Sequence, residues 1–205
     1  PRAISWSPGG AVGCPAPGRG AAQDWPQWRG INRDGISKDT GLLKQWPENG
    51  PRLAWKATGA GGGYSSFAVT NGRLYTLGLR GDREFIIAFD TATGKEVWAT
   101  PHGGAFRNDR GDGPRGTPTV EGNRVYALGG DGDLSALDVA NGKIIWTMNV
   151  LKKFGGEQIT WGISESPLIV GDKLLVNPGG PGASIVALNK KDGALIWKSQ
   201  SERAG

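Results

Sequence analysis

The residues best suited to chemistry stand in three short stretches, each of which leads into a segment of small residues. The stretches read GGGYSS (residues 61–66), DRGDGPRGT (109–117) and TWGISES (160–166). Their candidate site residues are Tyr64, Ser65, Arg115, Thr117, Trp161, Ser164 and Glu165. An arginine and a glutamate beside aromatic rings would suit a polar, planar or anionic ligand. The alternative is structural: small residues fill a crowded place, and Arg115 and Glu165 simply pair with each other.

Other reactive side chains are scarce. The chain has one cysteine, Cys14, and one histidine, His102. These counts exclude an intrachain disulfide and a metal centre built from cysteine or several histidines, and they disfavour a histidine-based triad. The acidic stretches RGDREF (80–85) and GGDGDL (129–134) do not match the calcium-loop pattern D-x-D-x-D-G, and both fall where tight turns are expected. We therefore assign no catalytic residue and no metal ligand from the residues alone.

Composition and charge narrow the function classes. The 205 residues include 36 glycines and 9 tryptophans, which is typical of short strands joined by tight turns. The net charge is +5, but residues 1–56 hold 8 Lys/Arg against 4 Asp/Glu, while residues 57–205 hold 16 against 15. The sequence has no basic stripe of the kind that would indicate nucleic-acid binding. It also has no run of about 20 apolar residues that would predict a transmembrane helix.

A ten-residue pattern recurs three times and explains most of the chain. The copies are FDTATGKEVW (89–98), LDVANGKIIW (137–146) and LNKKDGALIW (188–197). Each has glycine at its sixth position, tryptophan at its tenth and turn-forming polar residues before the glycine. The tryptophans are 48 and 51 residues apart. A repeat of about 50 residues indicates units that dock on one another through the same tryptophan and the same turn.

Each repeat divides into four expected strands. The first strands are expected at 66–69, 117–120 and 166–169; the second at 73–78, 124–129 and 173–178; the third at 85–90, 134–138 and 184–189; the fourth at 96–98, 144–146 and 195–197. Four short strands per repeat predict an all-β fold, a β-propeller of four-stranded antiparallel blades. First strands of blades line a central channel, so the three candidate stretches are expected to converge at one mouth of it, as a funnel lining.

The pattern ALD-x-x-(T/N)-G-K-x-x-W resembles the repeat of pyrroloquinoline-quinone (PQQ)-like β-propellers. That superfamily contains quinoprotein alcohol dehydrogenases and the propeller lipoprotein of the bacterial outer-membrane barrel-assembly machinery. The opening DWPQWRGINRDGISKDTGLLKQWPENGPRLAWK (24–56) is similar to that of exported bacterial propeller repeat proteins. The resemblance spans residues 24–205. It implies a periplasmic binding or assembly scaffold without evident catalysis, which meets a protein partner or a small polar ligand at its funnel.

The same resemblance leaves an enzyme as the alternative. A PQQ- and calcium-dependent dehydrogenase of alcohols or sugars would use Glu165 as a calcium ligand and Trp161 as a stacking surface for the quinone. The vicinal cysteine pair typical of the alcohol dehydrogenases is absent from this sequence. The resemblance alone therefore leaves the cofactor, PQQ with calcium, open.

The repeats account for about three blades plus an N-terminal lead-in, whereas propellers have roughly 4–8 blades. The lead-in LAWKATG places Trp55 where an outer strand of a further blade would end. We therefore expect an incomplete ring, from an N-terminal fragment of a longer protein or from copies that self-associate. The expected divisions are an export-signal remnant or disordered tail (1–23), in which Cys14 is a weak candidate for a lipid anchor, an extension with a lead-in strand (24–56), and blades of about 57–100, 101–150 and 151–205.

Overall fold

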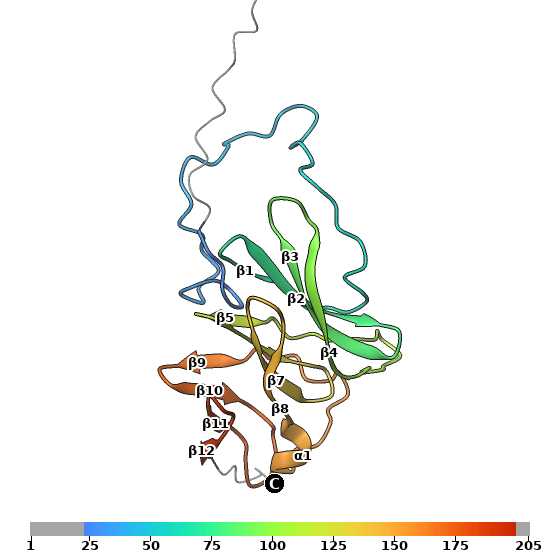
Figure 1. Cartoon of the computed structure of the whole chain (residues 1–205), viewed down its shortest axis with the longest axis vertical. Coiled ribbons are helices and arrows are strands. Elements are labelled where there is room, and N and C mark those ends of the chain that lie inside the picture. Colours follow the sequence, from blue (N-terminus) through green and yellow to red (C-terminus); the bar gives the residue numbers. More distant parts are fainter. Residues whose placement is uncertain (1–22, 200–205) are drawn as a thin grey trace, which may run out of the picture.

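The computed structural model describes residues 23–199, which form three four-stranded antiparallel sheets that do not close into a ring (Figure 1). The first blade consists of β1 (Ala68–Thr70), β2 (Arg73–Arg80), β3 (Arg83–Asp90) and β4 (Glu96–Gly104). The second consists of β5 (Thr119–Glu121), β6 (Arg124–Leu128), β7 (Asp133–Asp138) and β8 (Ile144–Asn149). The third consists of β9 (Leu168–Val170), β10 (Lys173–Val176), β11 (Val186–Asn189) and β12 (Leu195–Lys198). Within each sheet the strands lie in chain order, so the predicted all-β blades are confirmed.

The turns between third and fourth strands have the predicted chemistry. The side chain of Asp90 accepts from the backbone N–H of Thr93 at 2.8 Å, and Asp138 accepts from Ala140 at 2.8 Å. Asn189 does the same in the third blade. The turn glycine of the second copy, Gly142, has φ of +72°, in the left-handed region that side chains disfavour. Each turn is thus held by contacts within its own few residues.

The repeated tryptophans join one blade to the next. The indole Nε1 of Trp98, on β4, donates to the carbonyl of Val139 at 3.0 Å, and that of Trp146, on β8, donates to Lys190 at 3.2 Å. Both carbonyls belong to the β-turn after the third strand of the following blade. The structural role predicted for the tryptophan pattern is therefore correct.

The core lies between blades and not inside any one of them. One cluster of buried apolar residues joins the first and second blades, and another joins the second and third. In the first cluster the ring of Trp98 lies 5.9 Å from that of Tyr75, and in the second Trp146 lies 6.3 Å from Tyr126. Both rings of each pair belong to one blade, and the apolar cluster packs them against the next blade, which favours docking of neighbouring blades.

Two local features differ from expectation. The lead-in around Trp55 forms no strand, and Leu53 is 74% exposed because no strand lies beside it to pair with. Trp55 nevertheless docks as the other tryptophans do, donating to the carbonyl of Thr91 at 2.7 Å. A helical turn, α1 (Val150–Phe154), follows β8 and was not predicted; Asn149 caps its N-terminus by accepting from the N–H of Lys152.

Among residues 23–199 no helix has the length and apolar character needed to cross a bilayer. The expected export-signal remnant or disordered tail (residues 1–23) and the anchor hypothesis for Cys14 fall, except for Gln23, outside the described part of the chain. The divisions at residues 24–56, 57–100, 101–150 and 151–205 stay predictions.

Candidate functional site

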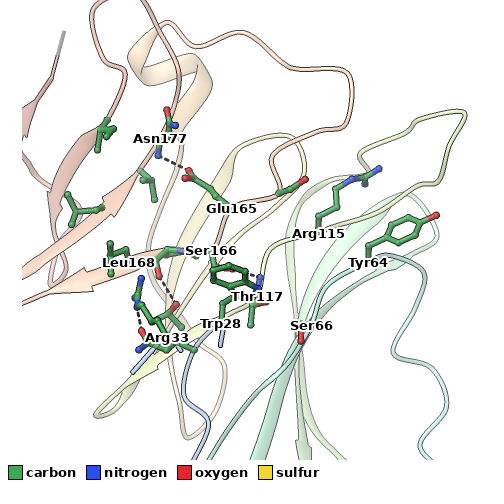
Figure 2. A pocket seen from close by; sticks show the side chains of 17 residues that line it. Trp28, Arg33, Tyr64, Ser66, Arg115, Thr117, Glu165, Ser166, Leu168 and Asn177 are labelled. Atoms are coloured by element: carbon green, nitrogen blue, oxygen red, sulfur yellow. Dashed lines mark hydrogen bonds between the residues drawn. The ribbon is translucent and has the colours of Figure 1, made fainter. Parts of the chain in front are cut away.

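A cavity of about 610 Å³ opens where the segments that precede the inner strands β1, β5 and β9 meet the N-terminal segment. Its walls come from residues 27–33, from the segments before β1, β5 and β9, and from β10 and the approach to β11. Its volume lies within the range usual for sites that bind small molecules or side chains. Figure 2 shows the side chains that line it, with Trp28 among the labelled residues near the centre and Glu165 and Arg115 to either side above it.

Five of the seven candidate residues line this one cavity, although they come from three different blades. They are Tyr64, Arg115, Thr117, Ser164 and Glu165. The backbone N–H of Thr117 donates to the hydroxyl of Ser166 at 2.9 Å, which ties the start of β5 to the start of β9. The three stretches before β1, β5 and β9 therefore do come together, as the repeat register predicts.

Ser65 and Trp161 do not line the cavity. The Ser65 hydroxyl is buried without a hydrogen-bond partner among the described residues. The Trp161 side chain is 49% exposed and lies under the guanidinium of Arg110, 5.1 Å from the ring centroid. Ser65 lies between Tyr64 and Ser66, which both line the cavity, and side-chain direction alternates along extended backbone; Trp161 lies in a turn. Both stay candidate residues only by prediction.

Arg115 is held by its own loop. Its guanidinium donates to the carbonyl of Gly111 at 2.7 Å and also to that of Gly113. It stacks on Phe106, 4.2 Å from the ring centroid, and lies 5.5 Å from the ring of Tyr64. These contacts fix a cation beside Tyr64, whose side chain nevertheless stays 62% exposed.

Glu165 makes a different contact from the one expected. Its carboxylate accepts from the backbone N–H of Asn177 at 2.7 Å, and in Figure 2 it points away from Arg115. The ion pairs found among the described residues do not include Arg115 with Glu165, so the simple pairing hypothesis is wrong. Burial raises the pKa of Glu165 to about 7, opposed by the Asn177 hydrogen bond. Near neutral pH this group can therefore either donate or accept.

Sequence reasoning missed the N-terminal wall of the cavity. Gln27, Trp28 and Arg33 line it, and the Arg33 guanidinium donates to Gln27 Oε1 at 2.6 Å. The segment is held in place by Trp25, which forms an antiparallel bridge with Val69 of β1. The pair of tryptophans in DWPQW was the only available signal, and it does not reveal where the segment lies.

The described side chains do not by themselves make up a calcium site. Calcium takes 6–8 oxygen ligands, several of them carboxylates. Within residues 23–199 no group of three or more His, Cys, Asp or Glu side chains is placed to hold a metal ion, and Glu165 is the single carboxylate in the cavity wall. The walls of the cavity offer hydrogen-bonding groups, aromatic surface and apolar contact.

The chain is similar to proteins described as outer membrane assembly factors and to a quinone alcohol dehydrogenase subunit. The family model described as "Outer membrane protein assembly factor BamB" matches residues 40–205. BamB of Moranella endobia is 30% identical over 144 residues, covering 68% of this chain and 34% of that protein. The dehydrogenase subunit of a quinone alcohol dehydrogenase of Gluconobacter oxydans is 32% identical over 121 residues, covering 54% of this chain and 16% of that protein. The chain thus spans about a third or less of the length of these relatives.

A solved structure supports the fold. The quinohemoprotein alcohol dehydrogenase of Comamonas testosteroni superposes with a TM-score of 0.58 at 24% identity, covering 86% of this chain and 27% of the other. At this identity the likeness concerns architecture alone. It agrees with the four-stranded, sequentially ordered blades described above.

Proposed function

The chain belongs to the family of PQQ-like β-propellers described as outer membrane protein assembly factor BamB, and on that premise we propose that it is an exported, periplasmic binding scaffold. Its role would be to hold protein partners during assembly of outer membrane proteins. Catalysis has no part in this role. The funnel mouth would be the contact surface for those partners.

The proposal is best supported by the side chains of the cavity, whose charged groups already have partners and whose aromatic rings are exposed. The charged groups at the rim are already occupied, Arg115 by main-chain carbonyls and Glu165 by the N–H of Asn177. Beside them, Tyr64 and Trp28 are 62% and 53% exposed. A surface with fixed charges and exposed aromatic rings is typical of protein recognition, because rigid aromatic side chains lose little entropy on binding.

Photo-cross-linking tests the proposal. A photoreactive phenylalanine analogue is placed at Tyr64, at the funnel, and in a control variant at Val97, which is 42% exposed on β4 at the outer side of the first blade. Each variant is mixed with a urea-unfolded outer-membrane β-barrel protein as that protein is diluted from urea. Cross-links from position 64 that exceed those from position 97 support the scaffold. Equal yields, or none from either position, would refute it.

A quinone- and calcium-dependent dehydrogenase remains the alternative function, favoured by the 32% identity with the Gluconobacter subunit. Titration of the chain with PQQ and calcium, followed by tryptophan fluorescence, distinguishes the two. Saturable quenching below about 100 μM, equivalent to about −5.5 kcal/mol, would favour the quinoprotein. Its absence up to that concentration would exclude cofactor binding by this chain.

A further inference from the structure

The N-terminal segment pairs with the free edges of two inner strands. The backbone N–H of Trp25 donates to the carbonyl of Val69 at 2.6 Å, and the N–H of Val69 donates back to Trp25 at 2.8 Å. The next residue, Pro26, accepts from the N–H of Val120 at 2.8 Å. Residues 25–26 thus occupy the axial edges of β1 and β5, the edges that do not face β2 and β6.

The third blade has an equivalent edge. Val69, Val120 and Ile169 hold the same place in their blades, because each is the central residue of its inner strand and lies opposite Leu74, Val125 and Leu174 respectively. The N–H groups of Val69 and Val120 point away from their partner strands, toward the N-terminal segment. Antiparallel ladders alternate in this way, so the N–H and carbonyl of Ile169 also point toward the axis.

The N-terminal segment does not reach this third edge. After Pro26 the chain turns, and the N–H of Gly30 donates to the carbonyl of Gln27 at 3.0 Å. Within residues 23–199 no backbone hydrogen bond joins another segment to the axial edge of β9. An unpaired edge with both donor and acceptor is a template for one more extended chain.

The cavity described above opens directly beside this edge. Pro167 and Leu168 belong to its wall, and Leu175 and Ile185 add apolar surface from the same blade. Ile185 is 43% exposed. A side chain projecting from a segment paired with β9 would therefore find apolar contacts on one side of the cavity and the polar rim at its mouth.

We propose that the axial edge of β9 binds an extended polypeptide segment of a protein partner, next to the places that Trp25 and Pro26 occupy at β1 and β5. This inference rests on the proposed scaffold function and names the form in which a partner binds. Main-chain pairing supplies the attachment, and alternate apolar side chains enter the cavity. Because main-chain pairing does not read sequence, the site would accept many unfolded chains of β-forming composition.

Amide hydrogen exchange with a model peptide tests this directly. The probe is a capped hexapeptide of alternating threonine and valine, added to the whole chain. We expect the exchange of the Ile169 amide to slow at least about tenfold at saturation, since a new hydrogen bond protects it. The Val69 and Val120 amides are internal controls, because their hydrogen bonds already exist. Unchanged exchange at Ile169 in the presence of bound peptide would overturn the proposal.

Two controls separate main-chain pairing from apolar contact. The same peptide N-methylated at its four central residues should bind at least about tenfold more weakly, because it cannot donate from either edge. On the protein, Ile169→Pro removes the N–H and Ile169→Ala removes only the side chain, so binding should fall further in the first variant than in the second. If Ile169→Pro does not fold, the methylated peptide and the exchange data decide alone. Equal affinity for both peptides would overturn the inference.

The outcomes also distinguish this inference from the scaffold function. Cross-linking from position 64 without protection of the Ile169 amide would support the scaffold function and refute peptide binding at the axial edge of β9. Failure of both experiments would refute both proposals. Protection of Ile169 without cross-linking would show a peptide site in a protein that is not a scaffold for unfolded outer-membrane proteins.

Discussion

The indole ring of Trp98 lies directly against Gly142 of the next blade. A Cβ atom on Gly142 would stand 2.6 Å from Trp98 Cδ2, which is closer than real Cβ contacts allow. The same relationship holds between Trp55 and Gly94, and at Gly193 a Cβ atom would stand 2.7 Å from Met148 Cε and 3.0 Å from the ring of Trp146. The tryptophan of one repeat and the glycine of the following repeat are therefore two halves of one contact, which explains why both recur.

Truncating an engaged tryptophan should destabilise the fold, whereas truncating the last one should not. Trp98 is 9% exposed and Trp197 is 43% exposed. We expect Trp98→Ala to lower the free energy of unfolding by about 3–5 kcal/mol, through lost burial and a cavity. Trp197→Ala should change it by less than about 1 kcal/mol. Denaturant unfolding measures both, and similar losses in the two variants would contradict a blade-to-blade role for Trp98.

The close approach at Gly142 can be separated from its backbone strain. Gly142 and Gly122 both have positive φ, of +72° and +57°, but no atom lies within 4 Å of a Cβ placed on Gly122. Gly122→Ala should cost about 1 kcal/mol from strain alone. Gly142→Ala should cost about 1–3 kcal/mol more, because the methyl group displaces Trp98. Equal destabilisation in urea titrations would show that the ring moves aside freely.

Buried titratable groups between the first and second blades predict a pH-dependent stability. Glu84 is 1% exposed, and its carboxylate accepts from the N–H of Gly130 at 3.1 Å. Burial, opposed by this hydrogen bond and reinforced by the nearby charges of Asp131 and Asp133, raises the pKa of Glu84 from 4.5 to about 7. A raised carboxyl pKa stabilises the fold below pH 4.5, and this contribution is lost as the pH rises from 4.5 to 7.

Replacing Glu84 with glutamine should remove that dependence. Relative to the parent chain, Glu84→Gln should gain about 3 kcal/mol of stability between pH 4.5 and pH 7.5. Glu157→Gln, on an exposed residue, corrects for the loss of one negative charge. Burial lowers the pKa of His102 to about 4, so the contribution of His102 to stability is lost as the pH falls from 6.5 to 4. Because both chains contain His102, this contribution cancels in the difference between their stabilities. A constant difference across this range would show that Glu84 is solvated.

Arg115 should order the loop of residues 107–113. Its guanidinium donates to two carbonyls of that loop and stacks on Phe106. A lysine ammonium group cannot make both hydrogen bonds in this planar geometry or stack in the same way. We expect Arg115→Lys to weaken the protection of the Gly113 amide, which donates to the carbonyl of Phe106 at 2.9 Å, by about 1–3 kcal/mol in hydrogen exchange. The Gly142 amide, in the turn between β7 and β8, serves as the unaffected reference. Equal changes at both amides would indicate global destabilisation.

Local patterns accounted for the blades and for part of the site. Asp90, Asp138 and Asn189 act within a few residues of their own positions, so their turns follow from sequence. The inner-strand register follows in the same way, and it brings Arg115 and Glu165 to one cavity. Sequence did not reveal that these two residues have separate partners, because their contacts are with main-chain atoms whose positions depend on loop conformation.

The sequence by itself determined the unit of this protein: a four-stranded blade with an Asx–Gly turn and a docking tryptophan, each specified by contacts short in sequence. Only the tertiary structure decided what surrounds the axis. The segment at residues 25–33 reaches β1 and β5 across more than forty residues, and no local periodicity encodes so distant a pairing. The same holds for the burial of Glu84 and for the free edge at Ile169, since both depend on how whole blades and the N-terminal segment pack together.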